Sequence, residues 1–332
     1  MKICVLGYGM IARSHVSGYL KTMRAGSEDK LVGVCDIRAE RREALKDQLA
    51  NFADVSGDVH SYADYNEMLE KEAPDIVDIC LPTYMHRDFT VELLERGYHV
   101  QCEKPMALNA AECDDMIRAA EKSGKTLMIG MTLRFEALYL ELKKMIDDGR
   151  YGKLKSIHFE RLSDFPVWGY ENWFGDIKRS GGVALDLHIH DVDMIRFLFG
   201  EPEAVSAVAV GNHNCDCITI ESRFHYKDKI VSAIGDWGRA EGTPFAMYYY
   251  ANFEKATVLS DTKGNITVCA DGEVTPYEYE RPDRMQMEEQ YMEAVVKGAS
   301  NDINPLPSAK RDVEIVQILM ESAKREGEKI AL

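Results

Sequence analysis

The sequence lacks any excess of positive charge. Its 332 residues contain 40 lysines and arginines against 56 aspartates and glutamates, which gives a formal net charge of -16. An acidic field of this kind repels phosphate backbones and anionic lipid surfaces. We therefore expect neither nucleic acid nor a membrane among its partners.

Disulfide spacing and long apolar runs are also missing. The eight cysteines follow no disulfide-framework pattern, which is typical of small buried side chains in a reducing compartment. Cys215 and Cys217 flank one aspartate, a weak metal or redox pattern that the alternating faces of a strand explain better. No apolar run approaches a membrane span, and residues 1–6 are typical of a first strand rather than a targeting segment. We expect a cytoplasmic protein of about two domains.

A glycine-rich turn follows the first expected strand, residues 2–6. Residues 7–12 have the G-x-G-x-x-A pattern, in which Gly7 makes the turn, Gly9 lets the backbone approach a pyrophosphate and Ala12 allows close helix packing. The pyrophosphate then lies on a helix N-terminus, where free N–H groups and the helix dipole favour it. The residues of this turn expected to contact a dinucleotide are Gly7, Gly9, Met10 and Ile11.

A second apolar strand, residues 31–35, ends at Asp36. A carboxylate at this position accepts both ribose hydroxyls of NAD and repels a 2′-phosphate, so we expect NAD to be preferred over NADP. The competing explanation is that Asp36 caps a helix over residues 38–50. Arg38, itself an expected cofactor contact, lies close with Arg41 and Arg42, which keeps NADP as an alternative.

Strands and helices continue to alternate through the first part of the chain. Apolar runs predict strands at 75–81, 99–102 and 126–130, separated by helices at 88–96 and 110–122. This alternation is typical of a doubly wound parallel sheet, whose ligands bind at the carboxyl ends of the strands. The loops expected there are 7–12, 36–38, 82–86 and 103–105.

Two of these loops carry candidate site residues. Glu103 and Lys104 end one strand, which brings Lys104 into the crevice beside the cofactor, although surface lysines at strand ends are common. The loop 82–86 follows the strand predicted at 75–81 and lies at the same edge of the sheet.

The pattern changes near residue 128. We predict domains at 1–128 and 129–332, the second an α+β domain with a large open, mostly antiparallel sheet. Its strands alternate in polarity, which indicates one covered face and one face available to a partner. The expected strands are 154–162, 204–210, 218–225, 229–236, 246–251 and 254–260. The expected helices are 135–148, 285–297 and 308–326, the last two joined by a proline-rich loop at 304–307.

Acidic and imidazole side chains gather in residues 181–193, after a pair of glycines. The apolar spacing predicts a helix, on which Asp186 and His190 share a face, so that the carboxylate can orient the imidazole for proton transfer. A His-Asp pair is more often a satisfied polar cluster than a catalyst. A metal site of His188, His190 and Asp191 is disfavoured, because the two histidines diverge on a helix. We expect no metal.

Aromatic and polar side chains gather in the segment 165–182. Aromatic faces with scattered polar groups suit a sugar or polyol, whose C–H faces stack and whose hydroxyls need hydrogen bonds. The competing explanation is that the aromatics pack a long loop onto its sheet. The candidate substrate contacts are Trp168, Trp173 and Asp176.

Three separated motifs resemble those of the Gfo/Idh/MocA oxidoreductases, the group of glucose-fructose oxidoreductase and inositol dehydrogenase. They are the glycine turn at 7–12, Glu103-Lys104-Pro105, and the glycine pair at 181–182 leading to Asp186 and His190. The resemblance covers nearly the whole chain, but Val183 stands where a third glycine is frequent. It implies catalytic roles for Lys104, Asp186 and His190. It also implies a place near the nicotinamide for Pro82, Thr83 and His86 of the 82–86 loop.

The expected function is that of an NAD(P)-dependent oxidoreductase. It interconverts a secondary hydroxyl and a ketone on a sugar, polyol, inositol or related molecule, and His190 moves the hydroxyl proton. One alternative is an NAD-dependent glycosidase of the same fold that uses transient oxidation. The other is a non-catalytic sensor, which the set of Lys104, Asp186 and His190 disfavours. We expect a homodimer or homotetramer built by the open sheet face.

Overall fold

The computed structural model describes residues 1–213 and 215–332. Its contacts divide the chain into two compact units, Met1–Phe135 with Asp283–Lys310, and Glu136–Pro282 with Arg311–Leu332. The boundary predicted at residue 128 cuts the chain once, whereas these units are discontinuous. The segment 283–310, assigned from the sequence to the second domain, returns to the first unit because helix α10 packs against helix α1.

The first unit contains a six-stranded parallel sheet in the order β3-β2-β1-β4-β5-β6. This is the expected doubly wound topology, and its strand order reverses between β1 and β4, where such folds bind ligands. The strands are β1 (Lys2–Leu6), β2 (Lys30–Cys35), β3 (His60–Tyr62), β4 (Ile76–Ile79), β5 (His99–Glu103) and β6 (Leu127–Gly130). The helices are α1 (Met10–Arg24), α2 (Ala39–Ala50), α3 (Tyr65–Glu72), α4 (Thr83–Glu95), α5 (Ala110–Ser123), η1 (Thr132–Phe135) and α10 (Arg284–Val296).

Helix α4 begins earlier than predicted. The sequence favoured a loop over 82–86 and a helix from 88, but α4 starts at Thr83 with Pro82 as its N-cap residue. The fixed φ angle of proline suits a helix start. The predicted loop is therefore the first turn of a helix, which fixes Thr83 and His86 on a rigid element.

The second unit contains a nine-stranded sheet in the order β14-β13-β12-β11-β7-β10-β9-β8-β15. Its one parallel pair among the described residues is β7 with β10, so the predicted, mostly antiparallel sheet is confirmed. The strands are β7 (Leu154–Asp164), β8 (Ala204–Val210), β9 (Thr219–His225), β10 (Ile230–Arg239), β11 (Ala246–Phe253), β12 (Ala256–Ser260), β13 (Ile266–Ala270), β14 (Glu273–Tyr277) and β15 (Ile330–Ala331).

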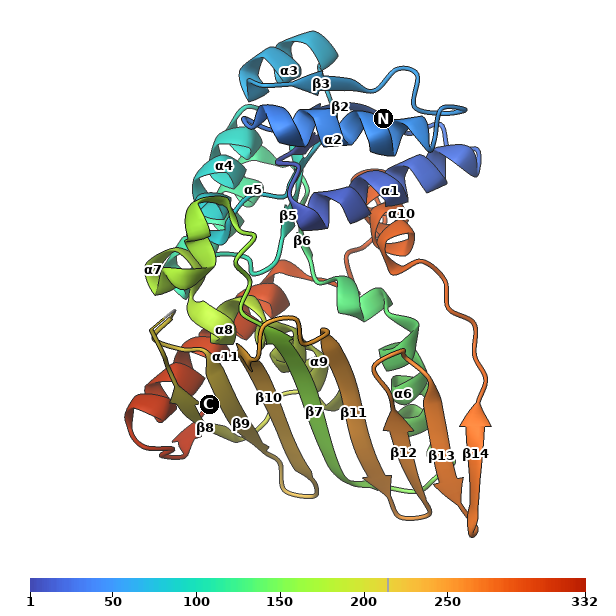
Figure 1. The fold of residues 1–332 in the computed structure, drawn as a ribbon, viewed down its shortest axis with the longest axis vertical. Coiled ribbons are helices and arrows are strands. Elements are labelled where there is room, and N and C mark those ends of the chain that lie inside the picture. The colour runs from blue at the N-terminus through green and yellow to red at the C-terminus, as the bar shows by residue number, and fades with distance from the viewer. Residues whose placement is uncertain (214) are drawn as a thin grey trace. The chain divides into compact units, whose positions relative to one another are not determined.

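Helices cover one face of this sheet (Figure 1). On the covered face, a row of residues paired across adjacent strands is buried throughout. Arg161 of β7 donates hydrogen bonds both to Asp191 of α9 and to Tyr139 of α6. The helices of this unit are α6 (Ala137–Asp147), η2 (Tyr170–Gly175), α7 (Ile177–Ser180), α8 (Gly182–Asp186), α9 (Ile189–Phe199) and most of α11 (Leu306–Lys324). The buried row is Ala207, Ser222, Ala233, Phe159 and Tyr249.

The opposite face of the same strands is open within this unit. A register row there is exposed or half-buried, and it mixes apolar with acidic side chains. The row is Val208, Glu221, Ile234, Glu160 and Tyr248. One covered and one open face is the arrangement that the alternating polarity of the strands predicted.

Some elements differ from the sequence predictions. Strands β3, β13, β14 and β15 were not predicted. Cys215 and Cys217 lie in the connection before β9, not on a strand with alternating faces. Both thiols are buried, and all eight cysteines are free. In the described part of the chain, no helix has the length and apolar character needed to span a bilayer.

Candidate active site

The turn between β1 and α1 fits a dinucleotide. Gly7 has φ +93°, and a Cβ atom there would lie 2.6 Å from the carbonyl oxygen of Cys80, so a side chain is excluded. A Cβ atom at Gly9 would meet no atom within 4 Å, which leaves the backbone open to a ligand. Among the described residues, no side chain caps the first turn of α1. The N–H groups of this turn, near Met10 and Ile11, suit an anionic pyrophosphate.

Asp36 follows β2 beside this turn. Its carboxylate accepts hydrogen bonds from four N–H groups: the Tyr8 amide at 2.9 Å, the Arg38 amide at 2.9 Å, and two guanidinium nitrogens of Arg38 at 3.1 and 3.2 Å. Burial alone would raise the pKa of Asp36, but the bonds to Arg38 and Tyr8 outweigh it and hold the pKa low. Asp36 is therefore an ionised acceptor at the position expected for ribose binding.

His86 is buried and lies between two backbone carbonyls. Its Nδ1 atom is 2.8 Å from the oxygen of Pro105, and its Nε2 atom is 2.8 Å from the oxygen of Leu81. Burial lowers the pKa of His86 more than the two carbonyls raise it. This residue was predicted to contact the cofactor. In the structure, its ring nitrogens link the start of α4 to the loop that follows Lys104.

Lys104 lies half-buried at the carboxyl end of β5. The buried Glu103 side chain turns back and accepts the Lys104 amide hydrogen at 3.0 Å. The Lys104–Pro105 peptide bond is cis. Lys104 thus occupies the edge of the parallel sheet where such folds bind ligands, as the sequence predicted.

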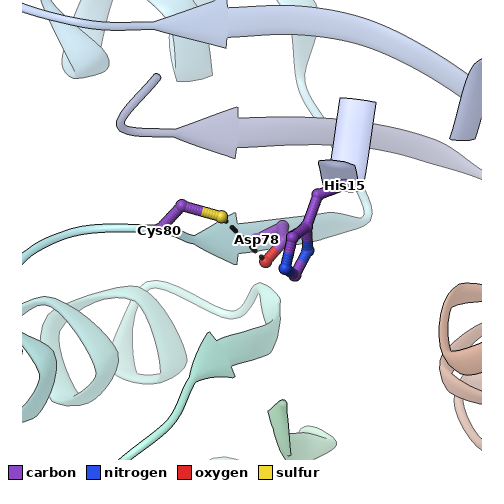
Figure 2. A group of neighbouring side chains, drawn as sticks. All are labelled: His15, Asp78 and Cys80. Atoms are coloured by element: carbon purple, nitrogen blue, oxygen red, sulfur yellow. Dashed lines mark hydrogen bonds and ion pairs between the residues drawn. The ribbon is translucent and has the colours of Figure 1, made fainter. Parts of the chain in front are cut away.

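A buried polar cluster lies next to this edge, and Figure 2 shows the Asp78 carboxylate between the His15 ring and the Cys80 thiol. Their donor atoms all lie within 4.8 Å of one another, as in a metal site. However, His15 already pairs with Asp78 and Glu103, each at 2.8 Å, and burial and the nearby Asp78 and Glu103 carboxylates raise the pKa of the Cys80 thiol. Hydrogen bonding accounts for this arrangement. The sequence analysis predicted no role for His15.

Asp186 and His190 do not share one regular helix, which corrects the sequence prediction. Helix α8 ends at Asp186, α9 begins at Ile189, and His188 stands between them. The His188 amide donates to the carbonyl of Val183, five residues back, which interrupts the i to i-4 pattern. Asp186 and His190 are both half-buried and belong to the second unit, whereas Lys104 belongs to the first.

His188 and Asp191, which flank His190 in the sequence, make buried contacts. Arg161 donates to Asp191 from two nitrogens, at 2.9 and 3.1 Å, and to Tyr139 at 3.1 Å. The Nε2 atom of His188 lies 2.7 Å from the Ser222 hydroxyl, and burial lowers the pKa of His188 to about 4. His190 is half-buried, whereas His188 is fully buried.

The aromatic rings of this segment pack against one another and against Trp237 of β10. Trp173 is buried and stacks on Phe174 with a centroid distance of 4.0 Å. The Asp176 carboxylate accepts the Lys178 amide at 2.9 Å and caps α7. Trp168 is exposed to about half and meets Phe174 edge-on. Packing explains Trp173 and capping explains Asp176, and Trp168 is the more exposed of the two rings.

Two family models match this chain. Residues 1–131 match the model of the GFO/IDH/MocA oxidoreductase family described as an NAD-binding Rossmann fold. Residues 139–243 match the model of the GFO/IDH/MocA C-terminal domain. The two matches follow one another in the order of the two structural parts described above.

Curated relatives and solved structures agree with these matches. The chain is 31% identical over 202 residues to the myo-inositol 2-dehydrogenase of Thermotoga maritima, covering 60% of this chain and 55% of that one. It is 28% identical over 209 residues to the D-glucoside 3-dehydrogenase of Escherichia coli, covering 63% and 57%. The aligned part thus spans little more than half of these relatives. An Agrobacterium radiobacter oxidoreductase, solved with NAD+, L-tartaric acid and magnesium, shares the fold, with a TM-score of 0.81, 16% identity and coverage of 100% and 98%.

Proposed function

Because the chain belongs to the Gfo/Idh/MocA oxidoreductase family, we propose that it is an NAD-dependent dehydrogenase. It interconverts a secondary hydroxyl of a sugar, polyol, inositol or related small molecule with the ketone. The observation that carries this proposal is the match to both family models, with relatives named for oxidation of inositol and of a glucoside. The uncapped first turn of α1 supports it, because it suits a pyrophosphate.

The proposed cofactor is NAD rather than NADP. The ionised Asp36 carboxylate accepts ribose hydroxyls and repels a 2′-phosphate. Its acceptor positions are taken by Tyr8 and Arg38, so the Arg38 guanidinium must move aside when the ribose binds. We propose that Pro82, Thr83 and His86 lie near the nicotinamide end of the cofactor. The His86 ring lies against the backbone carbonyls of Leu81 and Pro105 and so holds this part of the site in place.

The proposed mechanism assigns proton transfer to His190. When bound, the nicotinamide supplies the hydride acceptor or donor. His190 takes the hydroxyl proton as the carbinol carbon is oxidised, because an imidazole titrates near neutral pH and can return the proton in the reverse direction. Asp186 orients this imidazole. Lys104 donates a hydrogen bond to an oxygen that carries developing negative charge, which lowers the barrier.

The glycosidase alternative is not favoured, since the relatives reported above are dehydrogenases. A glycosidase of this fold would regenerate its cofactor in each cycle and give no net reduction. A sensor without catalysis would bind NADH but turn over no carbinol. Both alternatives are therefore separated from the proposal by the same assay.

We further propose that the chain forms a homodimer or homotetramer through the open face of the nine-stranded sheet. Exposed apolar side chains on its strands, among them Val208, Val210, Ile230 and Tyr250, support this. A second copy would bury them, and a face used by two identical copies gives a closed assembly. We propose a cytoplasmic location on the basis of the eight free cysteines.

A substrate panel tests the proposed function. Purified protein is mixed with polyols, aldoses and inositols, with NAD and NADP side by side, and the absorbance of reduced nicotinamide is followed. We expect net reduction with at least one secondary carbinol and faster turnover with NAD. Cleavage of glycosides without net reduction would instead support the glycosidase alternative.

A further inference from the structure

A fully buried histidine on the cofactor helix pairs with two acids at once. His15 lies in the second turn of α1, and its Nδ1 and Nε2 atoms each lie 2.8 Å from a carboxylate oxygen, of Asp78 and Glu103 respectively. Both nitrogens must donate, so the ring is an imidazolium. Burial lowers the pKa of His15, but the two carboxylates outweigh it and hold the pKa well above its usual value.

One of these acids also holds the backbone of the proposed catalytic lysine. Glu103 uses one carboxylate oxygen for His15 and the other for the Lys104 amide, at 3.0 Å. An unbroken chain of contacts therefore runs from α1 through His15 and Glu103 to Lys104. Because α1 begins directly after the glycine turn, its N-terminal end is the proposed pyrophosphate site.

The other groups that face His15 leave this pairing intact. The Tyr19 hydroxyl donates to Asp78 at 3.0 Å, and the Cys80 thiol lies 3.8 Å from the same side chain. Glu288 and Glu289 face the cluster from α10. Burial raises the pKa of both acids, that of Glu288 to about 8, which favours their neutral forms. Asp78 and Glu103 remain the hydrogen-bonding partners of the His15 ring.

We propose that His15 is a positioning residue that fixes the Lys104 backbone through Glu103 and so couples cofactor binding on α1 to the placement of Lys104. This inference rests on the proposed role of Lys104 in the dehydrogenase reaction. The hydrogen bond between His15 and Glu103 is charge-assisted and buried, so it admits few alternative geometries. A shift of α1 on binding the dinucleotide is therefore transmitted to the strand end that carries Lys104.

A double-mutant cycle tests whether His15 acts through Lys104. His15→Gln keeps a side chain of similar reach but loses the second donor and the charge. We expect it to lower kcat by about 10- to 100-fold with KM for the carbinol changed less than about threefold. In a Lys104→Met background, the same change should lower the remaining turnover less than about twofold. Equal losses in the two backgrounds would overturn the proposal, since a merely structural residue harms both.

Two further variants control this cycle. Tyr19→Phe removes a hydrogen bond to Asp78 in the same cluster without touching Glu103. It should leave kcat within about twofold of wild type. Glu103→Gln weakens the link itself and should reproduce the pattern of His15→Gln, which keeps the test decisive if His15→Gln does not fold. A Tyr19→Phe loss as large as that of His15→Gln would contradict the specific link.

Hydrogen exchange of the Lys104 amide separates this inference from the proposed function, because it needs no turnover. His15→Gln should speed exchange of the peptide containing Lys104 by about 10-fold or more while a peptide from β2 keeps its wild-type rate. NADH should slow that exchange in wild type and not in the variant. If wild type bound no NADH, the proposed function would fail while the exchange of the variant still tested the link. Unchanged exchange in His15→Gln with normal NADH binding would overturn the inference alone.

Discussion

Arg38 donates from two guanidinium nitrogens to the carboxylate of Asp36, at 3.1 and 3.2 Å. The acid proposed to select NAD is thus already paired with the cation that can attract a 2′-phosphate. Cofactor preference therefore depends on a balance between these two residues, rather than on Asp36 alone.

Substitution of Asp36 should shift this balance toward NADP. Asp36→Asn keeps the shape and removes the charge, so we expect the preference for NAD over NADP to fall by about 10- to 100-fold, or roughly 1 to 3 kcal/mol. Arg38→Ala is the matched variant and should weaken the binding of NADP more than the binding of NAD. The test is to measure the dissociation constants of NAD and NADP for the wild type and for each variant. Equal preference in wild type and Asp36→Asn would contradict the proposed role.

Substitution of His190 or Lys104 should impair chemistry and not cofactor binding. We expect His190→Ala and Lys104→Met each to lower kcat by about 10²- to 10⁴-fold, because each removes a group proposed to act on the reacting oxygen. NAD affinity should stay near the wild-type value. His60→Ala, which removes an exposed imidazole of β3, serves as the control. Near-native turnover and an unchanged pH profile in His190→Ala would make Lys104 the leading proton carrier.

Glu288 should make the protein less stable as the pH rises. Burial raises its pKa in the folded protein from 4.5 to about 8. Between these values the folded state holds a proton that the unfolded state has released. Its stabilising contribution is therefore full below pH 4.5 and is lost as the pH approaches 8.

Glu288→Gln should remove this pH dependence. Stability measured by urea unfolding from pH 5 to 8 should fall less steeply in the variant, by up to about 1.4 kcal/mol per pH unit. Glu70→Gln, which replaces an exposed acid of α3, should leave the slope unchanged. A wild-type slope in Glu288→Gln would mean that Glu288 is ionised in the folded protein.

The open sheet face should be an interface between copies. Light scattering should return a multiple of the 37.6 kDa chain mass. Ile230→Glu brings a charge to this face and should shift the mass toward the monomer. Val167→Glu, at a more exposed apolar position outside the sheet, should leave it unchanged. A monomer mass for wild type at micromolar concentration would rule out the proposed assembly.

Local patterns were sufficient for much of the fold. The apolar run before Gly7 and the alternation of burial in strands such as Thr219–His225 are properties of short segments, and the structure contains both elements. The break at His188 was missed because the residues on both sides keep helical spacing. Strand β3 was missed because three residues carry too little pattern.

The buried cluster could not be found in the same way. His15 pairs with acids 63 and 88 residues away, so no spacing in the sequence relates them. Glu288 and Glu289 lie in a predicted helix, where acidic side chains are expected to be exposed because acids are rarely buried without a partner. Lys104 was identified from its place at a strand end, and Asp186 and His190 from their spacing on a predicted helix. The resemblance implied their catalytic roles, which stay predictions.

Transfer of a labelled hydride tests the central claim most directly. Wild-type protein is mixed with NAD and the most active carbinol of the panel, carrying deuterium on the carbon that bears the hydroxyl group. The reduced nicotinamide is then analysed by mass spectrometry. We predict that it carries the deuterium, because the hydride passes directly from carbon to nicotinamide. Absence of reduced nicotinamide, or its formation without the label, would contradict the assignment as a dehydrogenase.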